Sequence, residues 1–133
     1  MGKVLVCDNE ADTRKFMKYA LEKAGHNVVT ASDGKSCIKA WEDEKPDVIL
    51  VDLMMPDLSG WDVAKKILDH DNSQRIAFIS ALEASDERKR SLRKLGIIDY
   101  ILKPVTAEDL VDRVERILEI DEATRRVNRI GYY

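Results

Sequence analysis

The chain has 133 residues, of which 44% are hydrophobic and 35% are charged, and its net charge at pH 7 is −3. This length allows one domain with its own core. The apolar runs, such as Val48 to Val51, are far too short to cross a bilayer, and no secretory signal opens the sequence. We therefore expect a cytoplasmic domain that binds no membrane and, given the acidic balance, no nucleic acid directly.

The first half of the chain alternates short apolar runs with helical stripes. Residues 4–7 form the first run. A stripe from Phe16 to Ala24 follows at helical spacing and is closed by Gly25, in the position of a C-terminal cap. A second run covers residues 27–30, and a second stripe begins with residues 38–41.

The second half continues the same alternation. Residues 48–51 form a third run that is apolar throughout, as expected of a strand covered on both faces. A stripe over residues 63–68 precedes a fourth run at 76–79. A fifth run at 98–102 leads into a strong last stripe over residues 110–118.

The helical segment over residues 83–94 differs from the others because most of its side chains are charged. Its apolar content is little more than Ala84, Leu92 and the following Leu95. A helix with so thin an apolar face is held weakly to its sheet. The segment is either an ordinary surface helix or an element that can move.

Five alternations of strand and helix predict parallel strands joined by right-handed crossovers, and hence an α/β three-layer sandwich. Ligands of such sheets bind at the carboxyl ends of the strands. We expect residues 1–120 to form this domain. Residues 121–133 are expected to be a C-terminal extension with no output domain, in which the helical pattern continues through Ala123 and Val127.

Polar side chains follow four of the predicted strands. Asp8 and Asn9 follow the first, Asp52 ends the third, Ser80 ends the fourth and Lys103 ends the fifth. We expect these side chains to meet in one shallow site, because the carboxyl ends of parallel strands share one edge. Crowded carboxylates repel one another unless a cation joins them, and Mg²⁺ prefers such oxygen ligands. The lysine would suit a phosphate oxygen as a point charge.

In order and spacing, the chain resembles the receiver domain of response regulators over residues 3–120. The residues that carry the resemblance are Asp8, Val51-Asp52-Leu53-Met54-Met55-Pro56, Gly60, Ser80-Ala81, Asp99-Tyr100 and Lys103-Pro104. The resemblance implies a flavodoxin-like, doubly wound sheet of five parallel strands in the order 2-1-3-4-5. It also implies a signalling domain in a two-component system, not an enzyme, which catalyses at most its own phosphorylation and dephosphorylation.

The resemblance also implies roles for the site residues. Asp52 would accept a phosphoryl group from a sensor histidine kinase or a histidine phosphotransfer protein. Asp8, Asp52 and the backbone carbonyl of Met54 would hold Mg²⁺, and Lys103 would pair with the phosphate. Pro104 would fix the turn that aims the lysine, and we expect a cis bond before it.

The switch implied by the resemblance consists of Ser80, which would reach for the phosphoryl oxygen, and Tyr100, which would turn inward behind it. The fourth helix and nearby loops would then reorganise to control an unidentified output protein. A homodimer through the fourth helix, fifth strand and last helix is a habit of the family. The acids of a partner that could face the basic residues 88–94 are Asp99, Asp109 and Asp112.

One position departs from the family pattern, which usually has two adjacent acids after the first strand. Here Asp8 is followed by Asn9, in place of the usual direct metal ligand. An uncharged amide predicts weaker Mg²⁺ binding. Glu10 could compensate, although we expect its side chain to point toward the helix start. An alternative register, in which Cys7 replaces the first acid, requires a one-residue gap before Arg14, so we prefer Asn9 as the substituted ligand.

Three other functions compete with this interpretation. A phosphorylation-independent interaction module is compatible with Asn9. An aspartyl-phosphate hydrolase would need a second acid two residues after its nucleophile, where the chain has Met54. A flavin carrier would need a loop rich in hydroxyls and glycine after the first strand, where the acids Asp8 and Glu10 would repel a phosphate.

The cysteines and histidines carry no recognisable site motif. Cys7 and Cys37 lack the spacing of a metal site or of a disulfide framework, so we expect small buried side chains. His26 and His70 lie away from the acidic edge, and the sequence indicates no positioned partner for either.

Overall fold

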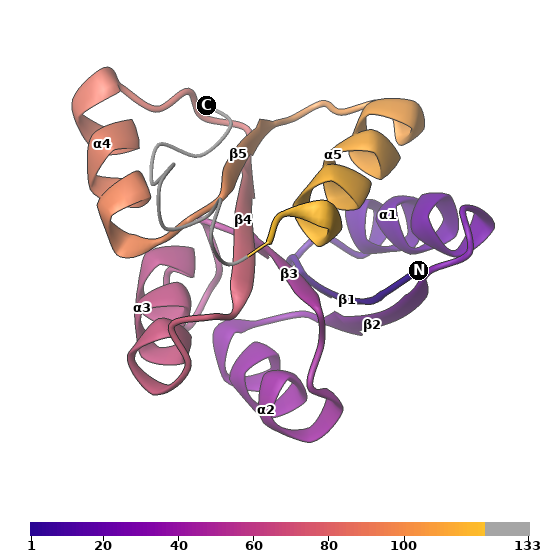
Figure 1. Ribbon diagram of the computed structural model, residues 1–133, viewed down its shortest axis with the longest axis horizontal. Coiled ribbons are helices and arrows are strands. Elements are labelled where there is room, and N and C mark those ends of the chain that lie inside the picture. Colours follow the sequence, from indigo (N-terminus) through magenta and orange to yellow (C-terminus); the bar gives the residue numbers. More distant parts are fainter. Residues whose placement is uncertain (122–133) are drawn as a thin grey trace.

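The computed structural model describes residues 1–121, in which five strands and five helices alternate (Figure 1). The strands are β1 (Lys3–Cys7), β2 (Asn27–Ala31), β3 (Val48–Asp52), β4 (Arg75–Ser80) and β5 (Asp99–Leu102). The helices are α1 (Ala11–Lys23), α2 (Gly34–Glu44), α3 (Gly60–His70), α4 (Asp86–Leu95) and α5 (Ala107–Glu119). All of the predicted strands are confirmed, and their ends differ from the prediction by at most one residue.

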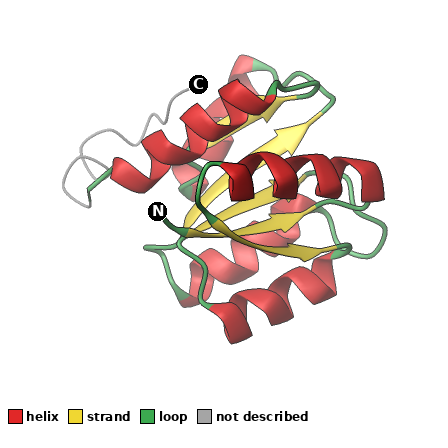
Figure 2. Cartoon of the chain, turned by 90° about the vertical axis from the view of Figure 1, so that its right-hand side faces the viewer, coloured by secondary structure: helices red, strands yellow, loops and turns green. Residues whose placement is uncertain are grey.

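The strands form one parallel sheet in the order β2-β1-β3-β4-β5, with helices on both faces (Figure 2). Helices α1 and α5 pack on one face, and α2, α3 and α4 pack on the other. The predicted three-layer sandwich and strand order are therefore confirmed. The central strand β3 is buried along its whole length, which explains its uninterrupted apolar sequence.

Alternate residues of each strand contribute to the two halves of the core. In β1, Val4 and Val6 face α1 and α5, whereas Leu5 and Cys7 face the other three helices. The predicted stripe of α1 is wrong at Phe16, whose side chain is 41% exposed. Each residue turns an α-helix by about 100°, so this side chain lies beside the buried stripe of α1.

Helix α4 is attached to the sheet by very little apolar surface. Within this helix, only Leu92 is buried, as the thin apolar face predicted. Both ends are well capped, because the Ser85 side chain accepts a hydrogen bond from the amide of Arg88 and Gly96 takes a φ of 109° at the C-terminus. The helix is therefore locally well formed but weakly packed.

Cys7 and Cys37 form a disulfide, which corrects the expectation of two separate thiols. The two Cα atoms are 5.9 Å apart and 30 residues apart in the chain. Both side chains are fully buried between β1 and α2. The pairing depends on how α2 lies on the sheet, and neither cysteine has a neighbouring cysteine that would have indicated it.

His26 has positioned partners, which also corrects the sequence analysis. Its side chain is buried, and Nδ1 accepts a hydrogen bond from the amide of Gly2 at 3.2 Å. Nε2 faces Glu115 Oε2 of α5 at 3.5 Å. The ring therefore joins the start of the chain to α5.

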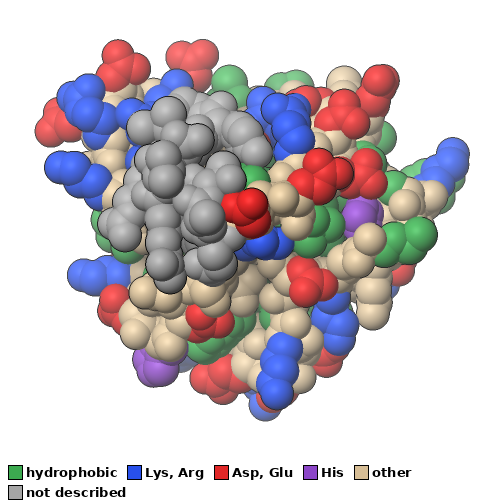
Figure 3. All heavy atoms as spheres, in the orientation of Figure 1, with side chains coloured by type: hydrophobic (Ala, Val, Ile, Leu, Met, Phe, Trp, Pro, Cys, Tyr) green, Lys and Arg blue, Asp and Glu red, His purple; other side chains and the backbone are tan. Residues whose placement is uncertain are grey.

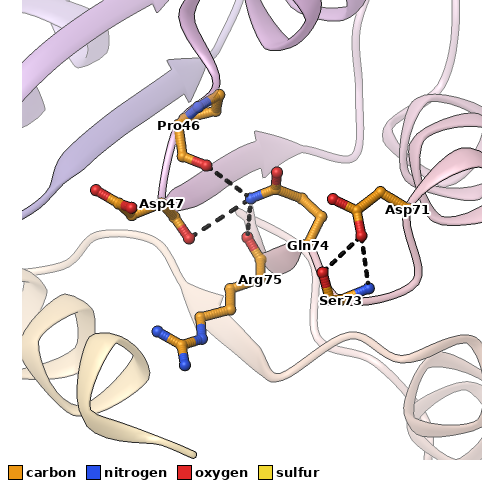
Figure 4. A pocket seen from close by; sticks show the side chains of 6 residues that line it. All are labelled: Pro46, Asp47, Asp71, Ser73, Gln74 and Arg75. Carbon is orange, nitrogen blue, oxygen red and sulfur yellow. Dashed lines mark hydrogen bonds between the residues drawn. The ribbon is translucent and has the colours of Figure 1, made fainter. Parts of the chain in front are cut away.

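A shallow polar pocket lies at the amino ends of β3 and β4 (Figure 4). The residues that line it are Pro46, Asp47, Asp71, Ser73, Gln74 and Arg75. Gln74 Nε2 donates to the carbonyl of Pro46 at 3.2 Å. The guanidinium of Arg75 donates to the carbonyls of Leu118, at 2.9 Å, and Ile120, which joins the start of β4 to the end of α5.

The last helix, α5, ends at Glu119. The expected helical continuation through Ala123 and Val127 lies outside the described residues. Among the helices of residues 1–121, none combines the length and apolarity needed to cross a membrane.

Candidate functional site

The predicted site residues meet at the carboxyl edge of the sheet. Asp8 directly follows β1, Asp52 is the last residue of β3, Ser80 is the last residue of β4, and Lys103 directly follows β5. Asp8 and Ser80 are fully buried and Asp52 is 5% exposed. The parallel topology therefore brings together four of the five side chains that the sequence selected.

Lys103 joins the two carboxylates. Its Nζ donates to Asp8 Oδ2 at 2.7 Å and to Asp52 Oδ2 at 3.0 Å. The Lys103-Pro104 bond is cis, as expected from the sequence, and the Lys103 amide donates to the carbonyl of Ser80 at 2.8 Å. The lysine is thus placed by its backbone as well as by its charge.

The sharing of one cation decides the charge balance of the site. Burial raises the pKa of Asp52, and the amide of Met54 and the Lys103 ammonium offset this effect only in part. Burial opposes the charge on Lys103, but its hydrogen bonds to Asp8 and Asp52 outweigh burial and raise its pKa. One lysine between two carboxylates is doubly stabilised, whereas each carboxylate has only a share of one cation. The site is therefore anionic and short of positive charge.

A closed loop follows the carboxylate of Asp52. The amide of Met54 donates to Asp52 Oδ1 at 3.0 Å. The amide of Gly60 donates to the carbonyl of Leu53 at 2.9 Å, which closes the neck of the loop. A Cβ on Gly60 would lie 2.5 Å from the carbonyl oxygen of Asp52, so only glycine fits there. Met54 itself is exposed beside the site.

Ser80 and Tyr100 lie along one path from the site toward α4. Ser80 Oγ accepts a hydrogen bond from the amide of Leu82 at 3.1 Å. The Tyr100 residue is buried, and its hydroxyl donates to the carbonyl of Leu82. The loop between β4 and α4 is therefore connected to both residues through Leu82.

Of the two residues after Asp8, Glu10 differs in direction from the expectation. Asn9 is exposed at the edge of the site. Glu10 occupies the N-cap position of α1, but its side chain makes no capping hydrogen bond, and Oε1 lies 3.9 Å from Lys103 Nζ. The expected direction of Glu10 toward the helix start is thus wrong. Cys7 lies in the core, bonded to Cys37, and so cannot take the place of an acid at the site.

Sequence reasoning missed two residues that support the site. Arg14 Nη1 donates to the carbonyl of Asp8 at 2.7 Å. Asp57 binds the loop after Asp52 to the first turn of α2. An acid near the start of a helix commonly caps it, and this pattern could have indicated Asp57. The helix that Asp57 binds, however, is α2, which begins 23 residues earlier in the chain.

The donor set fits a hard divalent cation. Asp8 and Asp52 bind the same ammonium nitrogen, so their oxygens are within reach of one cation. The described residues contain no cluster of three or more acidic, histidine or cysteine side chains around one point. A bound ion would therefore take its remaining ligands from amide and carbonyl oxygens and water, as Mg²⁺ does.

The response regulator receiver domain model matches residues 4–115. The chain belongs to this family. Receiver domains are signalling domains that generally bind Mg²⁺ at the phosphorylation site. Membership favours a phosphorylation-dependent receiver function over the phosphorylation-independent module.

Curated relatives cover almost the whole receiver domain. PhoP, the alkaline phosphatase synthesis transcriptional regulatory protein of Bacillus subtilis, is 38% identical over 123 residues, which are 90% of this chain and 50% of PhoP. The probable transcriptional regulator ycf27 of Guillardia theta is 36% identical over 98% of this chain and 48% of its own length. The receiver domain spans about half the length of these relatives.

Solved structures agree with the fold. Chemotaxis protein CheY4 of Vibrio cholerae superposes with a TM-score of 0.81 at 28% identity, covering 88% of this chain and 98% of CheY4. The receiver domain of the Francisella response regulator 1452 gives a TM-score of 0.80 at 34% identity, over 90% of this chain and 98% of its own.

Proposed function

We propose that this receiver domain accepts a phosphoryl group on Asp52 from a sensor histidine kinase or a histidine phosphotransfer protein. The observation that carries the proposal is the buried Asp52 carboxylate at the end of β3, which shares Lys103 Nζ with Asp8. An anionic site short of positive charge is suited to receive a phosphoryl group together with a metal ion.

The reaction is an in-line transfer between two nucleophiles. One carboxylate oxygen of Asp52 forms a bond to phosphorus while the bond from phosphorus to the donor's histidine nitrogen breaks, and the imidazole leaves with its electron pair. Lys103 exchanges its contact with Asp52 for a phosphoryl oxygen, while Asp8 continues to hold it. The domain would catalyse at most this transfer to itself and the later hydrolysis of the acyl phosphate.

We propose that Asp8, Asp52 and the Met54 carbonyl hold Mg²⁺, with Asn9 as a weakened fourth ligand. The ion would neutralise negative charge on the phosphoryl oxygens. Because Asn9 is uncharged, Asn9→Asp should tighten Mg²⁺ binding by about tenfold, since it adds a negative charge to the proposed ligands. An unchanged or weaker Mg²⁺ affinity in Asn9→Asp, measured by calorimetric titration, would count against Asn9 as a ligand.

Phosphorylation would act through Ser80, Tyr100 and α4. Ser80 Oγ would turn to the phosphoryl group and release the amide of Leu82, to which it is now bonded. The carbonyl of the same residue holds the Tyr100 hydroxyl, so both contacts change together. The weak packing of α4 would allow this helix to move, and the changed surface would control an output protein.

The first experiment is intact mass after incubation with a small phosphodonor, with and without Mg²⁺. We expect a Mg²⁺-dependent phosphoryl adduct that is absent in Asp52→Asn. Ser85→Ala is a suitable control, because it removes a cap of α4 without touching the site. If no adduct forms at high Mg²⁺, the phosphorylation-independent module becomes the better account.

We further propose a homodimer of the phosphorylated form through α4, β5 and α5, where Lys and Arg side chains gather over α4 (Figure 3). Two of the expected acidic partners, Asp99 and Asp109, pair with Arg113 of their own chain. Asp99 is buried, and both of its carboxylate oxygens accept hydrogen bonds from Nη1 of Arg113 in the same chain. Arg113 also pairs with Asp109. Asp112 is the remaining exposed candidate. A monomeric mass of the phosphorylated protein in solution would contradict the dimer.

The output stays a proposal of the same kind. The matched relatives are named as transcriptional regulators, and the chain spans about half of their length. We propose that this receiver controls an output domain or a separate output protein, and the cytoplasmic location expected from the sequence remains a prediction.

A further inference from the structure

The loop that follows Asp52 is joined to the first turn of α2 by one side chain. Asp57 Oδ1 accepts hydrogen bonds from the amide of Gly34 at 2.7 Å and from its neighbour Leu58 at 2.8 Å. Asp57 Oδ2 accepts from the amide of Lys35 at 2.9 Å. The hydrogen bond from the amide of Gly34 is the largest effect on the pKa of Asp57 and holds it below its ordinary value. The carboxylate is therefore charged at neutral pH.

Two amides in the first turn of α2 depend on Asp57 for their hydrogen bonds. The first turn of a helix has amide groups without partners inside the helix. In α2, the Asp33 side chain accepts from the amide of Ser36 at 2.8 Å, which is an ordinary cap. The amides of Gly34 and Lys35 are satisfied instead by Asp57, from a loop more than 20 residues away.

The two segments also pack too closely for any side chain at position 34. A Cβ on Gly34 would lie 2.6 Å from Leu58 Cβ, 3.1 Å from Val63 Cγ2 and 3.2 Å from Asp57 Oδ1. Gly34 has no positive φ, so an alanine there is compatible with the backbone but would push the loop away. The chain therefore offers a way to disturb the contact without removing the carboxylate.

The hydrogen bonds of Asp57 to α2 hold the loop at a point outside its neck. At the neck, Gly60 binds the carbonyl of Leu53, and near the site the amide of Met54 binds Asp52 Oδ1. Between these points, the Met55 side chain packs against the core, and the hydrogen bonds of Asp57 join the loop to α2. Because Met54 is exposed and lies in the same loop, a shift of the loop at Asp57 would also move the Met54 carbonyl.

We infer that Asp57 is a positioning residue, which binds the loop after Asp52 to α2 and thereby places the Met54 carbonyl for the metal ion. The inference rests on the proposed function, because it gives the metal site a support outside its own ligands. Such supporting residues typically change metal affinity by about 10–100-fold when they are lost.

The test compares Mg²⁺ affinity and amide hydrogen exchange in four variants of the whole chain. In Asp57→Ala and Gly34→Ala we expect the Mg²⁺ dissociation constant to rise about tenfold and the Met54 amide to exchange faster. Asp57→Asn should be intermediate, because its single oxygen can still accept from Gly34. Asp33→Ala is the matched control, since it removes a cap of α2 that does not touch the loop and should leave both quantities unchanged.

The outcomes separate this inference from the proposed function. If Asp57→Ala and Asp33→Ala have the same Mg²⁺ affinity, or the Met54 amide exchanges at the wild-type rate in Asp57→Ala, the inference is wrong. If the wild-type chain binds no Mg²⁺ and accepts no phosphoryl group, the proposed function fails. Exchange at Met54 then still decides whether Asp57 fixes the loop.

Discussion

Burial of the Asp52 side chain raises the pKa of its carboxyl above the ordinary value. Its carboxylate is buried, and the one nearby cation is shared with Asp8. A carboxylate with a raised pKa binds protons more readily in the folded chain than in the unfolded chain. Its charge therefore opposes folding above that pKa, and the opposition fades as the pH falls through it.

This charge predicts the pH dependence of an uncharged replacement. Asp52→Asn should raise the free energy of unfolding near neutral pH, because it removes a buried charge while Asp8 still pairs with Lys103. The gain should shrink at a lower pH, below the raised pKa of Asp52, where the wild-type carboxyl is protonated. Urea denaturation at both pH values measures it, and a less stable variant at neutral pH would contradict it.

At the scale of elements, the strongest unforeseen link is the disulfide between β1 and α2. It closes a loop with a sequence separation of 30 residues. Disulfides that close loops of this size typically stabilise a fold by about 2–4 kcal/mol. Cys37→Ser should therefore lower the free energy of unfolding by about 3 kcal/mol. Reduction of the wild-type chain is the matched comparison, and equal stability of the oxidised and reduced chains would refute the prediction.

Helix α4 gives a second prediction at this scale. Leu92 is its one buried side chain, so Leu92→Ala removes most of its attachment to the sheet. We expect a loss of about 3 kcal/mol in the free energy of unfolding. Faster hydrogen exchange should be confined to α4 and the loop before it. Leu110→Ala in α5 is the comparison, because its helix keeps Val114 and Ile117 in the core. Exchange that rises equally across the sheet would argue against independent release of α4.

The elements were predictable where local pattern and burial coincide. The run at 48–51 reads as a covered strand because both faces of β3 are buried. The site was predictable for the same reason, since Asp52 ends β3 and Lys103 directly follows β5. The Asp57 link, the Cys7–Cys37 disulfide and the contacts of His26 were not predictable. Each joins segments whose approach depends on how a helix lies on the sheet, and periodicity does not contain that information.

At the scale of the whole molecule, the two edges of the sheet formed by the strand ends differ. The carboxyl edge holds the candidate site, and the amino edge holds structural contacts. The carboxyl ends of the strands carry the carboxylates and Lys103. The amino ends carry the polar pocket (Figure 4) and the contact of Arg75 with the carbonyl of Leu118 in α5. Arg75→Met should lower the free energy of unfolding by about 1–2 kcal/mol, because charged hydrogen bonds to carbonyls are lost. Phosphorylation should persist, and loss of the adduct would show that the edges are not independent.

Strand β4 reaches both edges, with Arg75 at one end and Ser80 at the other. Its length is roughly 16 Å for five residue steps. It is hydrogen-bonded to β3 on one side and to β5 on the other. Its first residue, Arg75, donates a hydrogen bond to the carbonyl of Leu118 near the end of α5. Strand β4 cannot move along its own axis without breaking its hydrogen bonds to both neighbouring strands and the contact of Arg75 with α5. If phosphorylation turns Ser80 toward the phosphoryl group, as proposed, the displacement would therefore pass sideways into the loop before α4 and not along β4.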